Sequence, residues 1–100
     1  MPQENSNIKE RSRSELNSPG QYGVVFHNDD FTPMDFVISI LVNIFFKEIK
    51  EATKLMLRVH HEGMAVVGVY SYDIAHSKVL TATNIARQQG FPLRITVEKI

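Results

Sequence analysis

The sequence predicts one domain of mixed α and β structure, whose elements follow the order strand, helix, helix, strand, helix, strand. Three observations support this prediction. The chain has 100 residues, which is the size of one domain. Apolar residues make up half of residues 21–100 but only three of the first twenty. Within residues 21–100, the apolar spacing changes between a period of two, typical of strands, and one near 3.6, typical of helices.

Residues 1–20 are predicted to be a disordered tail, and residues 21–100 form the predicted domain. Since Met1, Ile8 and Leu16 are its only apolar residues, the tail cannot bury enough surface to offset its ordering entropy. It has no apolar run long enough for a signal peptide, and no later stretch is long enough for a membrane span. We therefore expect a cytoplasmic protein without a membrane partner.

The domain is predicted to begin with a strand that leads into a helix. Residues 22–26 alternate with period two, which indicates a strand, and the short polar side chains of residues 28–30 indicate a turn. Thr32 and Asp35 have the spacing of a capping box. We therefore expect Thr32 to cap a helix that runs from residue 33 to about residue 46.

A second helix and a second strand follow. Apolar residues at helical spacing from Ile49 to Val59 predict an amphipathic helix that ends near Gly63, a residue suited to a helix C-terminus. Residues 64–70 are almost all apolar and include several β-branched side chains. This pattern is typical of a strand buried on both faces.

The last two predicted elements are a helix and a strand. Asp73 opens a pattern in which alanine and valine repeat at helical spacing as far as Gly90. Residues 93–97 then alternate between apolar and polar side chains, which is the clearest strand pattern of the chain.

The composition argues against several classes of function. Eleven basic and eleven acidic residues give a net charge of zero, so nothing favours binding to nucleic acid or to an anionic membrane. The absence of cysteine excludes disulfides, thiolate zinc sites and a cysteine nucleophile. The four histidines lack the spacing of a helical zinc site, and no catalytic or phosphate-binding motif is present. We therefore expect no enzyme, no metal and no cofactor.

Two segments carry the side chains best suited to bind a ligand. Residues 28–30 lie at the predicted turn after the first strand, where a purely structural turn is the simpler interpretation. Met56, Val59 and His60 share one face of the second helix, and core packing is the simpler interpretation there. The residue types alone leave both interpretations open.

Residues 28–37, Asn-Asp-Asp-Phe-Thr-Pro-Met-Asp-Phe-Val, and residues 52–60, Ala-Thr-Lys-Leu-Met-Leu-Arg-Val-His, resemble the ClpS family. These proteins are adaptors that deliver N-end-rule substrates to a Clp AAA+ protease. The resemblance covers residues 21–100 with a polar tail in front. It implies a compact α+β fold, in which a three-stranded, mainly antiparallel sheet packs against the helices.

The resemblance also implies a function. The chain would be a non-enzymatic adaptor that binds a free α-amino group followed by a Phe, Tyr, Trp or Leu side chain. Asn28, Asp29 and His60 would bind the amino group, since an ammonium with three donors needs acceptors and preferably a carboxylate. The family positions of the side-chain pocket correspond here to Asp30, at its polar edge, and to Thr32, Met34, Val37, Met56, Val59 and Leu93.

Further features of the resemblance concern selectivity and delivery. Met34 would exclude β-branched side chains by its shape. Phe26 and His27 stand where the family usually has aliphatic residues, so the preference among Phe, Tyr, Trp and Leu stays open. Asp73 and Lys78 match positions that the family uses against the N-terminal domain of a ClpA-type unfoldase, and the tail would take part in substrate delivery. We expect the adaptor to be a monomer.

Two other classes of function are compatible with the predicted architecture. One is a protein interaction domain like the carboxy-terminal domain of the ribosomal stalk protein, which has no amino-acid site. Such a domain does not require the combination of Asn28, Asp29 and His60. The other is a small hydrolase with an aspartate and His60 as acid and base, which only the residue types support.

Overall fold

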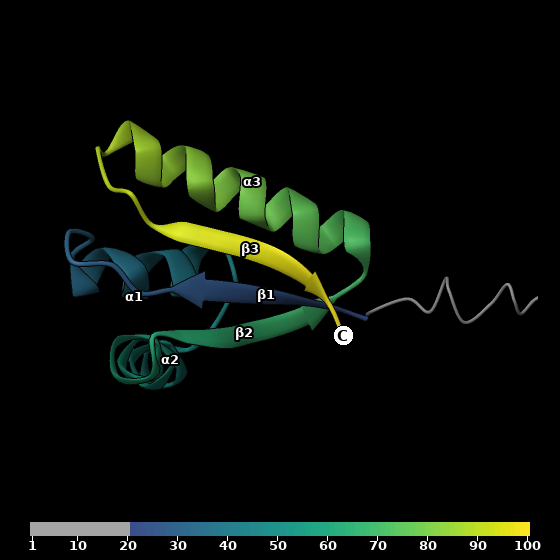
Figure 1. Ribbon diagram of the computed structural model, residues 1–100, viewed down its shortest axis with the longest axis horizontal. Coiled ribbons are helices and arrows are strands. Elements are labelled where there is room, and N and C mark those ends of the chain that lie inside the picture. Colours follow the sequence, from purple (N-terminus) through teal and green to yellow (C-terminus); the bar gives the residue numbers. More distant parts are fainter. Residues whose placement is uncertain (1–20) are drawn as a thin grey trace, which may run out of the picture.

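The structure is a computed structural model that describes residues 21–100 (Figure 1). The predicted disorder of residues 1–20 lies outside the described residues. The elements are β1 (Tyr22–His27), α1 (Met34–Asn43), α2 (Ile49–Glu62), β2 (Met64–Tyr70), α3 (Tyr72–Gln88) and β3 (Arg94–Lys99). This order confirms the one predicted from the apolar spacing.

The three strands form one sheet in the order β2-β1-β3, and both pairs are antiparallel. The α+β prediction is therefore confirmed. Phe26 in the central strand pairs with Ala65 of β2 and Ile95 of β3, and the β1–β2 register shifts between Val24 and Val25. Strands that are far apart in the sequence are thus joined through β1.

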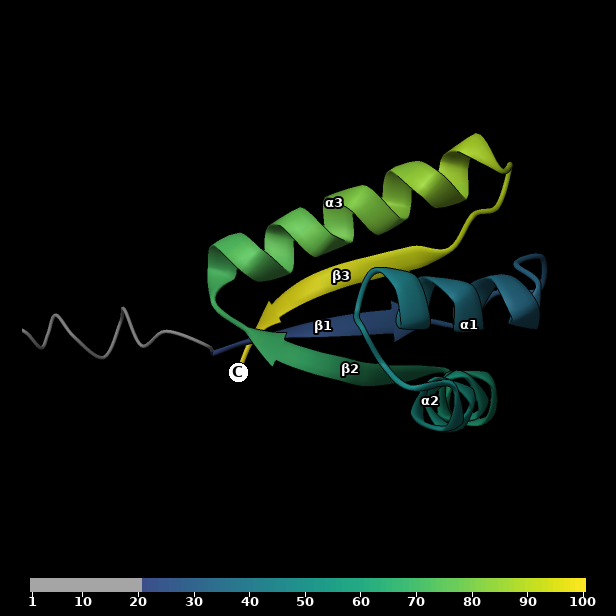
Figure 2. The same cartoon turned by 180° about the vertical axis from the view of Figure 1, so that it is seen from behind.

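The helices pack against one face of the sheet. Figure 1 shows the strands from their uncovered side, and in the reverse view of Figure 2 α1 lies in front of them. One apolar core fills the space between the layers, and Val24, Phe26 and Leu41 are fully buried in it. The α3 helix contributes Ala75, Ala82 and Ala86 to this core, small side chains that let it lie close to β3 and β1.

The prediction that the second strand is buried on both faces is wrong. Ala65 and Val67 of β2 are buried, but Met64, Val66 and Val69 are 49%, 47% and 49% exposed. The reason is that β2 is an edge strand of an antiparallel sheet that has helices on one face only. An apolar run alone did not distinguish this case from a strand covered on both sides.

The predicted capping box of the first helix is also wrong. The residue before α1 is Pro33, and no side chain caps the helix. The Thr32 hydroxyl instead donates to the carboxylate of Asp29. The helix ends at Asn43 rather than near residue 46, and Phe46, further along the loop, has a left-handed backbone with φ of 57°.

The second and third helices end as the sequence predicts. Gly63 follows α2 with a left-handed φ of 88°, and its N–H donates to the carbonyl of Val59. Gly90, with φ of 82°, follows the end of α3. Among residues 21–100 there is no helix long and apolar enough to cross a membrane.

One backbone contact brings the two candidate segments together. The N–H of Asn28, directly after β1, donates to the carbonyl of Gly63 at the end of α2, at 2.8 Å. The loop that leaves the central strand therefore lies beside the last turn of α2. This contact places the polar residues 28–30 opposite the face of α2 that carries His60.

Candidate functional site

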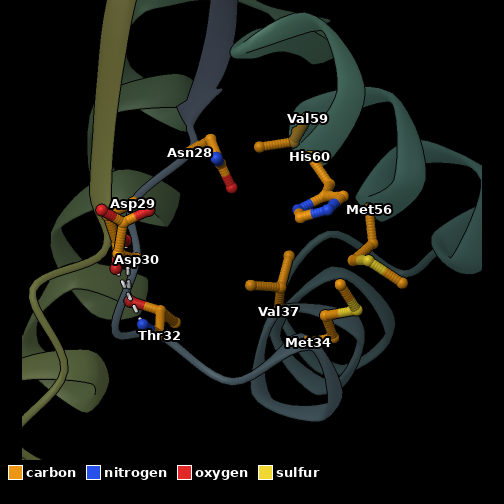
Figure 3. A pocket seen from close by; sticks show the side chains of 9 residues that line it. All are labelled: Asn28, Asp29, Asp30, Thr32, Met34, Val37, Met56, Val59 and His60. Atoms are coloured by element: carbon orange, nitrogen blue, oxygen red, sulfur yellow. Dashed lines mark hydrogen bonds between the residues drawn. The ribbon is translucent and has the colours of Figure 1, made fainter.

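A cavity of about 220 Å³ lies between the loop after β1, the start of α1 and one face of α2 (Figure 3). It is lined by Asn28, Asp29, Asp30, Thr32, Met34, Val37, Met56, Val59 and His60. The structure thus brings together every residue that the sequence suggested for the amino group and for the side-chain pocket, with the exception of Leu93.

The loop on one side of the cavity is organised by Asp29. One oxygen of its carboxylate, Oδ1, accepts hydrogen bonds from the backbone N–H groups of Phe31 and Thr32, at 2.8 and 2.7 Å. The other, Oδ2, accepts from the hydroxyl of Thr32 at 2.8 Å. The turn predicted at residues 28–30 is present, and it is formed by the side-chain hydrogen bonding that favours aspartate in turns.

These contacts set the charge state of Asp29. Partial burial alone would raise the pKa of this carboxyl. The hydrogen bonds from Thr32 and Phe31, together with the positive charge of Arg87 in the last turn of α3, outweigh burial and lower the pKa below its usual value. Asp29 is therefore ionised at neutral pH and uses most of its acceptor capacity within its own loop.

The remaining polar groups have free acceptors. Asn28, Asp30 and His60 are exposed, and in Figure 3 the Asn28 amide and the His60 ring both point into the cavity. Within residues 21–100, the side chains of Asn28 and Asp30 make no hydrogen bond or ion pair. An amide oxygen and a carboxylate are thus available at one end of the cavity, with an imidazole facing them from α2.

The other end of the cavity is apolar. Val37 of α1 and Met56 and Val59 of α2 are buried, with 7%, 7% and 4% of their surfaces exposed. Met34, in the first turn of α1, is 45% exposed and lies at the rim. The amphipathic face of α2 therefore supplies residues to the core and to the apolar wall of the cavity, and Met56 and Val59 belong to both.

Leu93 does not line the cavity, so the structure corrects its predicted place. Its side chain is 1% exposed and belongs to the core between the sheet and the helices. Its carbonyl and that of Phe91 accept hydrogen bonds from Arg87, at 2.8 and 2.9 Å. The electrostatic effect of Arg87 on Asp29 could not be anticipated from the sequence, because α3 and the loop after β1 are far apart along the chain.

The two positions that depart from the family pattern also lie away from the cavity. Phe26 is fully buried and packs edge-to-face against Phe45. The Nε2 of His27 lies 2.9 Å from the hydroxyl of Thr96 on β3. Neither side chain is a wall of the cavity, so neither selects directly among ligands there.

Asp73 and Lys78 lie on α3, outside the cavity. Asp73 is exposed in the first turn of the helix. The Nζ of Lys78 donates to the carbonyl of Ile44 at 2.9 Å and lies 4.5 Å from the ring centre of Phe46. A second cavity, of about 210 Å³, lies beside this contact and is lined by Asn43, Ile44, Phe46, Ser77, Lys78 and Thr81.

Comparison with known proteins assigns the family. A family model described as "ATP-dependent Clp protease adaptor protein ClpS" matches residues 17–96. The chain belongs to the ClpS family of Clp protease adaptors. The ClpS protein of Vibrio atlanticus is 45% identical over 95 residues, which are 95% of this chain and 90% of the relative. That of Shewanella denitrificans is 47% identical over 91 residues, which are 91% and 89% of the two chains.

A solved structure shows the same ClpS fold. It is described as "The structure of Agrobacterium tumefaciens ClpS2 bound to L-phenylalaninamide", and it aligns with a TM-score of 0.80 at 37% identity. The alignment covers 83% of this chain and 100% of that one. Among residues 21–100, no group of three or more His, Asp or Glu side chains could hold a metal ion.

Proposed function

We propose that this adaptor binds the N-terminal residue of substrate proteins when that residue is Phe, Tyr, Trp or Leu, and delivers these proteins to a ClpA-type unfoldase. One observation carries the proposal. The cavity has free polar acceptors at one end, from Asn28, Asp30 and His60, and an apolar wall at the other. A free amino group next to a bulky apolar side chain is complementary to both ends at once.

The Agrobacterium relative supports this choice of ligand. That protein binds L-phenylalaninamide, which carries a free amino group and an aromatic side chain on the same carbon atom. The size of the cavity also fits. Sites for drug-sized ligands measure roughly 300–1,000 Å³, so a cavity of about 220 Å³ suits a single side chain and its amino group.

The amino group is assigned to three acceptors. An α-ammonium has three donors, which the Asn28 oxygen, a carboxylate and the neutral imidazole of His60 can accept. The family resemblance assigned the carboxylate to Asp29, but that group already accepts three of the about four hydrogen bonds within its reach. We therefore assign the main carboxylate to Asp30, whose oxygens are free within the described chain, and leave Asp29 at most one contact.

The apolar end selects the first side chain. Burying a Phe or Leu side chain contributes on the order of 1.5–3 kcal/mol, which corresponds to roughly ten- to hundredfold in affinity. Met34 lines the cavity at its rim, where its unbranched side chain is 45% exposed. This placement supports a role for Met34 in excluding Val and Ile.

A peptide series tests the proposed function. We expect fluorescence anisotropy to show binding of labelled peptides that begin with Phe or Leu. The same peptide with Gly in first place should bind roughly ten- to hundredfold more weakly, because it leaves the apolar end empty. Equal affinities for the Phe and Gly peptides would refute selection by the cavity.

Delivery is assigned to a separate surface. Asp73 on α3 is exposed, and Phe46 beside the second cavity is 78% exposed although it is a large apolar residue. Exposed aromatic side chains beside a hollow are common where proteins meet. We assign this region, with Asp73 and Lys78, to contact with the N-terminal domain of the unfoldase, apart from the peptide cavity.

A further inference from the structure

We propose that Asp29 and Thr32 are positioning residues, whose side-chain hydrogen bond holds the loop of residues 28–32 in the shape that presents Asn28 and Asp30 to the substrate amino group. The inference rests on the proposed function of the cavity. It concerns residues that act through the loop rather than by the strength of their own contact with the ligand.

The loop depends on Asp29 for its internal hydrogen bonding. None of the backbone–backbone hydrogen bonds within residues 21–100 involves residues 29–32. The N–H groups of Phe31 and Thr32 donate to the Asp29 carboxylate instead. The nearest backbone bond is that of Asn28 to Gly63. Asp29 thus takes the place of the backbone acceptors that a regular turn would use.

Thr32 closes this arrangement from the other side. Its hydroxyl donates to Oδ2 of Asp29 at 2.8 Å, while its backbone N–H donates to Oδ1 at 2.7 Å, so both carboxylate oxygens are held by one residue. Two contacts from a single residue fix the plane of the carboxylate as well as its distance. Asp30 lies between Asp29 and Thr32 in the chain. The hydrogen bonds between those two residues therefore also fix the backbone from which the Asp30 side chain extends.

Thr32 connects the wall of the cavity with the loop at its amino-group end. Thr32 lines the cavity and is bonded to Asp29 at the same time. Loss of its hydroxyl should therefore disturb the amino-group end even where the volume of the cavity wall is unchanged. The effect of removing the hydroxyl therefore distinguishes a positioning residue from a residue that only lines the cavity, because the latter acts through its volume and its apolar surface alone.

Two substitutions of Thr32 test the inference. Thr32→Val keeps the size of the side chain but removes the hydroxyl donor, whereas Thr32→Ser keeps the donor and removes a methyl group. We expect Thr32→Val to weaken binding of a peptide that begins with Phe by about tenfold or more, as for other hydrogen bonds to charged groups. Thr32→Ser should lose no more than about fourfold, the value of one methyl group.

A second readout does not depend on peptide binding. The side-chain carboxyl carbon of Asp29 can be followed by NMR as the free protein is titrated with acid. Because the Thr32 hydroxyl helps to lower the pKa of Asp29, the midpoint should move upward in Thr32→Val and remain near the wild-type value in Thr32→Ser. Thr32→Asn is not suitable, since its amide offers a new donor.

The outcomes separate this inference from the proposed function. An upward shift in Thr32→Val with about tenfold weaker peptide binding supports positioning. Wild-type affinity in Thr32→Val, or an equal loss in Thr32→Ser and Thr32→Val, overturns it. If no wild-type peptide binds at all, the proposed function fails on its own, and the NMR titration still reports whether Thr32 holds Asp29.

Discussion

Asp29 and Asp30 are neighbours of the same residue type, yet the structure gives them different surroundings. The carboxylate of Asp29 accepts three hydrogen bonds from Phe31 and Thr32, whereas that of Asp30 is exposed and makes none within residues 21–100. A residue that organises a loop should matter for stability, and one that faces a ligand should matter for binding. The two positions are therefore the natural pair for a matched comparison.

The stability contributed by Asp29 should depend on pH. Its pKa in the folded chain is lowered, so the ionised form stabilises the fold fully above the unfolded pKa of about 3.9. This contribution is lost as the pH falls through the lower, folded pKa. We expect Asp29→Asn to have a smaller free energy of unfolding than the wild type in urea at pH 6, and the difference to shrink towards pH 3.

Asp30→Asn is the control for that measurement. Because the Asp30 carboxylate has no partner in the described part of the chain, its substitution should leave the unfolding free energy nearly unchanged at both pH values. The same variant should weaken binding of a Phe peptide by about tenfold. A loss of stability in Asp30→Asn as large as in Asp29→Asn would contradict the separation of the two roles.

At the scale of elements, α3 makes contacts that the sequence did not suggest. Lys78 donates to the carbonyl of Ile44, directly after α1, and lies over the ring of Phe46. A cation at the carboxyl end of a helix is favoured by the helix dipole. Lys78 therefore fixes the end of α1, so its substitution would mix effects on stability with effects on the proposed delivery.

Asp73 is the cleaner probe of the proposed delivery surface, because it is exposed in the first turn of α3. We expect Asp73→Asn to weaken binding to the N-terminal domain of the unfoldase by several-fold and to leave the affinity for a Phe peptide unchanged. Calorimetric titration with that domain would measure the change.

Glu51 provides a matched control for Asp73, since it occupies the first turn of α2 and is also exposed. Both substitutions remove one negative charge near a helix start, at a similar small cost in stability of about 0.3–1 kcal/mol. If Glu51→Gln weakens unfoldase binding as much as Asp73→Asn, general charge and not the surface of α3 is responsible.

At the scale of the whole molecule, the order of all six elements could be predicted from apolar spacing, because each element has one apolar face against a common core. The exposure of β2 could not be predicted, since periodicity does not distinguish an edge strand from a central one. The capping box of α1 was predicted wrongly because the Thr32 hydroxyl bonds to Asp29 rather than to the helix. Such a choice between two partners depends on distances that the sequence does not contain.

The candidate site could likewise be predicted from the sequence only in part. The segments around residue 28 and residue 60 were identified by resemblance, and the contact of Asn28 with Gly63 explains how they meet. Leu93 does not line the cavity, because its side chain is buried in the core between the sheet and the helices. The different roles proposed for Asp29 and Asp30 rest on the hydrogen bonds of the loop, which the sequence does not show.

The most direct test of the account is the affinity ratio between one peptide with a free amino group and the same peptide with that group acetylated. Both begin with Phe and offer the same side chain to the apolar end of the cavity, so the test isolates the contacts proposed for Asn28, Asp30 and His60. We expect the free peptide to bind in fluorescence anisotropy and the acetylated one to bind at least tenfold more weakly. Equal affinities would show that the polar end does not recognise an amino group.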